Sequence, residues 1–99
     1  MILSFIIGAA IGYMVGEAIA EIFFTIYDRW HARTQISEKA KQKNPNINKL
    51  IVFVNQSDTI NDEEELVIKA YDKNNNHIAN INVTTPAGTG IRVGETMYT

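Results

Sequence analysis

Residues 1–27 read MILSFIIGAAIGYMVGEAIAEIFFTIY, and this stretch decides the expected fold. Its only charged side chains are those of Glu17 and Glu21. About 20 predominantly apolar residues in a helix are enough to cross the hydrocarbon core of a bilayer. A helix over residues 2–23 places Glu21 at the boundary of that core, where a carboxylate reaches headgroup water. The sequence therefore predicts a single transmembrane helix within residues 1–27.

Two other interpretations of this stretch stay open. Ala18, Ile19 and Ala20 have the small-x-small form of a signal-peptide cleavage site, although no Lys or Arg precedes the apolar run. The stretch is alternatively a buried core helix, but the rest of so short a chain would hardly cover it.

Small residues recur at every fourth position of the apolar stretch. They are Gly8, Gly12, Gly16 and Ala20. In lipid, such a stripe lets a second helix approach closely. We therefore expect self-association, or contact with another membrane protein, through this glycine stripe. The alternative is that the glycines reflect only the composition of a membrane helix.

The charge balance changes after residue 27. Residues 28–49 hold six Lys or Arg against two acidic residues, whereas residues 50–99 hold seven acidic against three basic residues. An apolar segment followed by aromatic and basic residues is typical of a membrane helix with its cytoplasmic flank. The sequence thus predicts a single-pass protein of the inner (cell) membrane, its carboxyl-terminal domain in the cytoplasm. The expected membrane-interface residues are Glu17, Glu21, Tyr27, Arg29, Trp30 and Arg33.

A basic helical stalk is expected over residues 28–45. The segment from Tyr27 to Lys43 contains no glycine or proline, and Pro45 pushes the preceding residue out of the α region, so the helix should end at Asn44. The few apolar residues of the stalk are spaced by four and form a thin seam. They are Ala32, Ile36 and Ala40. We expect most of the stalk to be solvated.

The lipid bilayer is the expected partner, and three lysines of the stalk are expected to contact anionic lipids. These are Lys39, Lys41 and Lys43. No aromatic side chains are interleaved with them, and the net charge of the chain is −2. A nucleic acid is therefore not expected as a partner.

Residues 46–99 are expected to form a small β domain. Apolar and alternating stretches predict strands over 50–54, 66–71, 77–84 and 91–93, joined as an antiparallel four-stranded meander. The alternative for the last strand is an extension to Tyr98 that is interrupted at Gly94. On the third strand, Ala79, Ile81 and Val83 should face the core, with Asn80 and Asn82 facing outward. The fold class is accordingly α+β, with one long N-terminal transmembrane helix continuing as a stalk before the meander.

Residues 66–84, LVIKAYDKNNNHIANINVT, resemble one hairpin of bacterial immunoglobulin-like domains. In that family a strand ends in an Asp-x-x-Gly-Asn type of turn and a second strand follows. The turn glycine is absent here, and the chain is too short for seven strands. We interpret the resemblance as shared hairpin chemistry.

No motif for chemistry is present in the sequence. The chain has no cysteine, which excludes thiol catalysis, and with only two histidines its composition disfavours a protein-only zinc site. We predict no enzyme activity, no cofactor and no metal. The predicted function is that of a membrane-anchored accessory or regulatory protein that docks another membrane component through its helix and small β domain. The alternatives are a filament or coat subunit, similar to a pilin or phage coat protein, and a small holin-like pore former.

Overall fold

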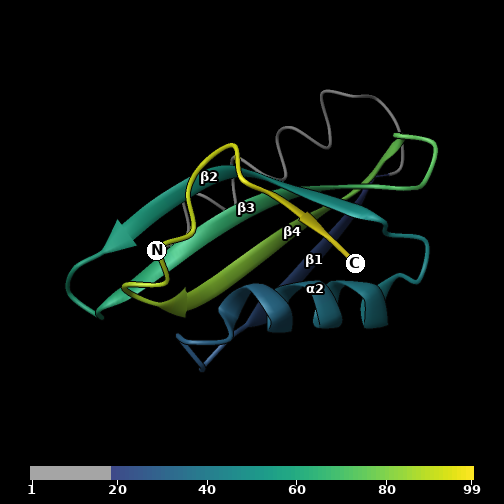
Figure 1. Ribbon diagram of the computed structural model, residues 1–99. Coiled ribbons are helices and arrows are strands. Elements are labelled where there is room, and N and C mark those ends of the chain that lie inside the picture. Colours follow the sequence, from purple (N-terminus) through teal and green to yellow (C-terminus); the bar gives the residue numbers. More distant parts are fainter. Residues whose placement is uncertain (1–18) are drawn as a thin grey trace.

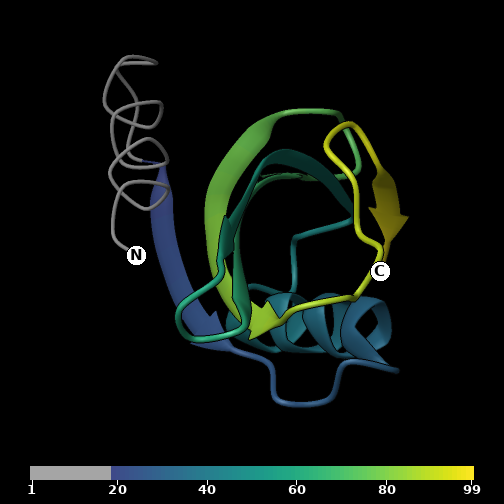
Figure 2. The ribbon, with the colours of Figure 1, turned by 90° about the vertical axis from the view of Figure 1, so that its left-hand side faces the viewer.

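The computed structural model describes residues 19–99, which form one sheet and one helix (Figure 1). The strands are β1 (Ala20–Thr25), β2 (Lys49–Asp58), β3 (Glu63–Tyr71), β4 (His77–Pro86) and β5 (Thr96–Tyr98), and the helix is α2 (Ala32–Lys43). The five-stranded sheet has the order β1-β4-β3-β2-β5. In Figure 2 the strands curve over an interior that α2 closes at the opposite side.

Strand β1 is the element that departs most from the fold expected from the sequence. It runs parallel to β4, with Ala20 opposite Ala79 and Thr25 opposite Thr84. Its sequence AEIFFT holds aromatic and β-branched residues, which favour strands. Alternate side chains of a strand point to opposite faces, so Ile22 and Phe24 pack against the core.

The expected transmembrane helix continuing as a stalk is wrong. Residues 20–25, which were expected in that helix, form a strand, because their backbone pairs with β4. Within residues 19–99, no helix has the length and the apolar character needed to span a bilayer. The prediction of a single-pass protein of the inner membrane with a cytoplasmic carboxyl-terminal domain is contradicted on the same grounds. Three stripe residues, Gly8, Gly12 and Gly16, and the predicted interface residue Glu17 lie outside the described residues.

Helix α2 ends where the sequence predicts but packs differently. The Asn44 N–H donates to Ala40 O at 3.0 Å, and Asn44 itself is extended before Pro45. The three seam residues are buried in the core, while most of the other side chains of the helix are polar. They are Ala32, Ile36 and Ala40. The helix is therefore not a solvated stalk, because its seam covers the apolar face of the sheet.

The sheet is mixed and five-stranded, so the expected four-stranded antiparallel meander is also wrong. Strands β2, β3 and β4 do pair antiparallel in that order, near the expected positions. Residues 91–93, however, are not a strand, and of the alternative extension to Tyr98 only Thr96–Tyr98 forms one. Gly90 and Gly94 have φ values of +75° and +89°, which bend the chain on both sides of this segment and delay the last strand to β5.

The inward face of β4 matches the sequence pattern, but the outward face does not. Ala79, Ile81 and Val83 are all in the core. Asn80 and Asn82 lie on the other face, yet both are 0% exposed. Their Nδ2 atoms donate to the Glu21 carboxylate at 2.7 and 3.1 Å. The parallel pairing of β1 thus supplies the acceptor that lets these amides be buried.

Helix packing can be tested with Ile36→Ala. Truncating a fully buried isoleucine should lower the free energy of unfolding by about 2–5 kcal/mol. The matched control is Gln42→Ala, an exposed position on the same helix where the change should stay within about 0.5 kcal/mol. Thermal melting followed by circular dichroism measures both. Equal, small effects would contradict the packing of α2 on the sheet.

Candidate functional site

A groove of about 850 Å³ separates α2 from β5. One wall is the polar face of the helix, with Arg33, Thr34, Ser37, Glu38, Lys41 and Gln42. The other wall is Met97, Tyr98 and Thr99. Concave sites between secondary-structure elements are the usual places where proteins bind ligands, so this groove is the candidate functional site.

The edge of β5 gives the groove backbone hydrogen-bonding groups. Strand β5 pairs with β2 on one side, and it is the last strand of the sheet on the other. The Val52 N–H donates to Glu95 O at 2.9 Å, and the Thr99 N–H donates to Asn48 O at 3.1 Å. In an antiparallel pair, residues alternate between directing their backbone groups toward the partner strand and away from it.

This alternation fixes which backbone groups of β5 are directed away from the sheet. Glu95 and Thr99 bond to the β2 side, so Met97 between them is also directed to β2, where it lies opposite Leu50. Thr96 and Tyr98 therefore direct their N–H and C=O groups away from β2. No further strand of residues 19–99 pairs with this side of β5.

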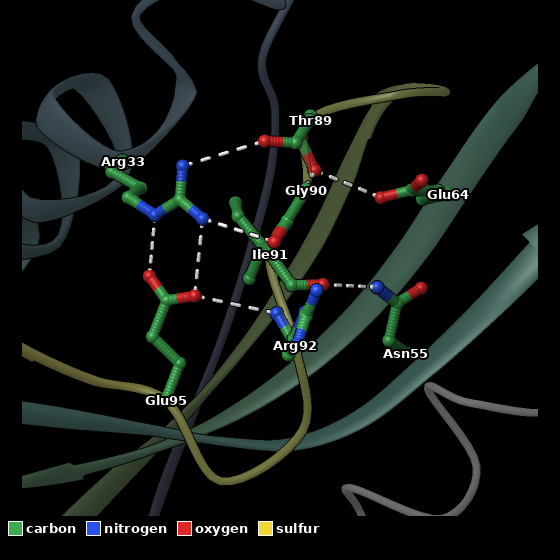
Figure 3. Close-up of polar contacts among 8 residues, drawn as sticks. All are labelled: Arg33, Asn55, Glu64, Thr89, Gly90, Ile91, Arg92 and Glu95. Atoms are coloured by element: carbon green, nitrogen blue, oxygen red, sulfur yellow. Dashed lines mark hydrogen bonds and ion pairs between the residues drawn. The ribbon is translucent and has the colours of Figure 1, made fainter.

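The segment that leads into β5, residues 87–95, is fixed by Arg33 from the first turn of α2 (Figure 3). We call this segment the strap. The Arg33 guanidinium makes a bidentate contact with Glu95, from Nε to Oε2 and from Nη2 to Oε1. The same guanidinium donates to Thr89 O at 3.4 Å and to Gly90 O at 3.0 Å. One side chain thereby joins the helix to two separate parts of the strap, at residues 89–90 and at Glu95.

Two side chains of the sheet hold the strap from the other direction (Figure 3). The Glu64 carboxylate of β3 accepts from the Gly88 N–H at 3.1 Å and from the Thr89 hydroxyl at 2.9 Å. The Asn55 amide of β2 donates to Ile91 O at 2.7 Å, and the Ile91 side chain is buried in the core. The strap is therefore a fixed part of the fold that sets the position of β5.

The ion pair in this network shifts the pKa of both partners toward their charged forms. The hydrogen bonds from Arg33 lower the pKa of Glu95, and the hydrogen bonds to Glu95 raise the pKa of Arg33. The side chains are 24% and 48% exposed for Glu95 and Arg33, respectively. Water screens so exposed a pair, and its contribution to stability is expected to be modest.

The structure brings two of the cations singled out from the sequence to the groove. Arg33, expected at a membrane interface, binds Glu95, and Lys41, expected on anionic lipid, donates from Nζ to Ile47 O at 2.9 Å. The Lys39 Nζ lies 5.9 Å from the centroid of the Phe24 ring. Lys43 is the last residue of the helix and is exposed.

The other singled-out residues that fall within residues 19–99 lie away from the groove. Ala20 begins β1, and Glu21 accepts from the buried amides of β4. The remaining three lie in the connection between β1 and α2 and are exposed. They are Tyr27, Arg29 and Trp30.

Sequence reasoning did not single out the β5 side of the groove as a site, although the alternative extension of the last strand to Tyr98 covers β5. Glu95 was visible only as one more acidic residue, and its partner is 62 residues away in the sequence. The one available signal was the alternation of Thr96, Met97 and Tyr98, with a single apolar core residue between two exposed ones.

Among residues 19–99 no group of three or more side chains is arranged to hold a metal ion. No family model, curated protein or solved structure matches this chain. The groove offers a ligand the outward N–H and C=O groups of Thr96 and Tyr98, opposite the polar face of α2.

The ion pair predicts a specific dependence on pH. A carboxyl group whose pKa is lowered on folding stabilises the folded state above its unfolded pKa of about 4.3, and this contribution is lost as the pH falls through the folded pKa. Glu95→Gln should therefore lower the free energy of unfolding at pH 7 by up to about 1 kcal/mol. The difference from the original chain should vanish in more acidic solution. Urea unfolding between pH 7 and pH 3 measures it.

Glu38→Gln is the control, because Glu38 is an exposed carboxylate on α2, the helix that carries Arg33. A Glu95→Gln chain that stays less stable by the same amount at every pH would contradict the ion pair as the source of the effect.

Proposed function

We propose that this chain is an accessory docking protein that binds an extended peptide segment of a partner protein as a sixth strand beside β5. The observation that carries the proposal is the outward direction of the N–H and C=O groups of Thr96 and Tyr98. Such an edge is a template for pairing with another chain, and strand addition is a recurring mode of peptide recognition. The role is one of binding rather than catalysis.

The groove supports this occupant because it offers room beside the edge. A strand added to β5 would lie between that strand and the polar face of α2. Neighbouring strands lie about 4.7–4.9 Å apart, so the added segment would contact the helix wall as well as the sheet. The helix would thereby restrict which extended segments fit.

The side chains on β5 divide the ligand's residues into two sets. Met97 points into the core, whereas Tyr98 is 71% exposed on the other face. A ligand residue opposite Met97 would place its side chain on the helix side, near Ser37 and Lys41. Its two neighbours would place theirs beside Tyr98 and Thr96. Main-chain hydrogen bonds would supply affinity, and alternate side chains would supply selectivity.

The test uses Tyr98→Pro and the matched variant Tyr98→Ala. Proline removes the outward N–H of residue 98, which the sheet does not use, and proline is tolerated at such an edge position. Alanine removes the same side chain but keeps the N–H. Peptides of random sequence are selected by display on the immobilised full chain, and their affinities for both variants are then measured by calorimetry.

We expect the selected peptides to bind Tyr98→Pro at least about tenfold more weakly than Tyr98→Ala, which corresponds to the loss of one well-formed hydrogen bond. Circular dichroism checks that both variants keep the sheet. Equal affinity for the two variants, or no peptide selected above background, would rule out strand addition at β5.

A further inference from the structure

The connection between β1 and α2 exposes two large aromatic side chains. Tyr27 is 85% exposed and Trp30 is 84% exposed, and Trp30 is the only tryptophan of the chain. Tryptophan, tyrosine and arginine are the residues most enriched at the energetic centres of protein interfaces. Arg29 lies between the two aromatic residues in the sequence. We call Tyr27, Arg29 and Trp30 the aromatic loop.

Hydrogen bonds to Asp28 order the backbone of the aromatic loop at Trp30 and His31. The Asp28 Oδ1 accepts from the Trp30 N–H at 2.9 Å and from the His31 N–H at 3.3 Å. The Asp28 Oδ2 lies 2.7 Å from the His31 Nδ1. Ile26 before the loop and Ala32 after it are both buried. A loop whose backbone is ordered in this way loses less backbone entropy on binding than a disordered one.

Arg29 gives the aromatic loop a cation that is available to a ligand. Its Cζ lies 5.8 Å from the centroid of the Trp30 ring. Its aliphatic part lies over Gly88 of the strap, where an added Cβ would be 3.6 Å from the Arg29 Cδ. The adjacent carboxylate, Asp28, is engaged by Trp30 and His31, and no ion pair joins Arg29 to a carboxylate of residues 19–99.

We propose that the aromatic loop is a second docking surface, separate from the groove, for an acidic protein segment that carries a large apolar side chain. A carboxylate of that segment would bind the Arg29 guanidinium, which is suited to planar, bidentate contact with carboxylates. The apolar side chain would cover Trp30 and Tyr27, removing their exposed rings from water.

The charges around the aromatic loop favour a protein over a nucleic acid. A strand of nucleic acid is held through several phosphates, each bound by a cation. Here Arg33, the nearest other arginine in the sequence, is bound to Glu95. Asp28 places a negative charge next to Arg29, and the net charge of the chain is −2. An available cation beside the Trp30 ring, with the exposed Tyr27 three residues before Trp30 in the sequence, fits a single carboxylate with an apolar neighbour.

The test uses the emission of Trp30, which reports on this loop alone because the chain has no other tryptophan. The full chain carrying Tyr98→Pro, which blocks strand addition at β5, is titrated with a capped decapeptide that alternates Asp and Phe. We expect a saturable blue shift of the emission. A matched peptide with Asn in place of every Asp should bind at least about tenfold more weakly.

Two further variants locate the contact. Arg29→Gln should weaken binding of the acidic peptide about tenfold, whereas Arg92→Gln, which removes another exposed arginine, should leave it unchanged. The Tyr98→Pro background keeps this result distinguishable from failure of the proposed strand addition, since only the groove depends on residue 98.

Three results would overturn the inference. The first is the absence of any shift with the acidic peptide up to millimolar concentration. The second is equal binding of the Asp and Asn peptides, or of the Arg29→Gln chain. The third is a saturable shift with oligothymidylate or with phosphatidylglycerol vesicles but not with the acidic peptide, which would assign the loop to phosphate ligands.

Discussion

The packing of the α2 seam onto the sheet is the contact on which the rest of the structure depends. A sheet with one apolar face must cover it with another layer, and a chain of this size has few residues available for that purpose. Ala32, Ile36 and Ala40 supply the cover, and two of the three are alanines that let the helix lie close to the strands. The same contact turns the opposite face of the helix into a wall of the groove, and it places Arg33 within reach of Glu95.

The spacing of apolar and polar residues predicted those parts of the fold that depend only on neighbouring residues. The alternation in β3 and β4 and the Asn44-Pro45 end of α2 follow from neighbouring residues, and they lie where expected. Strand β1 depends instead on a distant partner, because Glu21 meets Asn80 at a separation of 59 residues. A continuous apolar run looks the same whether it will pair with β4 or form a helix, so its period alone does not distinguish the two.

The candidate site was less predictable than the fold, for a related reason. Arg33 and Lys41 were conspicuous as cations, but a cation in a sequence does not reveal its acceptor. Arg33 reaches Glu95 because the strap bends at Gly90 and Gly94, whereas the local sequence does not show which distant side chain these bends bring close. An edge is likewise a property of sheet order. Strand β5 is the last strand of the sheet formed by residues 19–99. The sequence of Thr96–Tyr98 does not by itself reveal this edge position.

The strap links the two proposed surfaces mechanically. Its Gly88 supports the stem of Arg29 in the aromatic loop, and its Glu95 leads directly into β5. Between these points it is held by Glu64, Arg33 and Asn55, which come from three different elements. The aromatic loop and the groove therefore keep a fixed relation to each other. A partner that engaged one surface would present its second segment to the other at a high effective concentration, without new contacts at either surface. The contacts that hold the strap would thus let two surfaces of modest affinity bind one partner with high overall affinity.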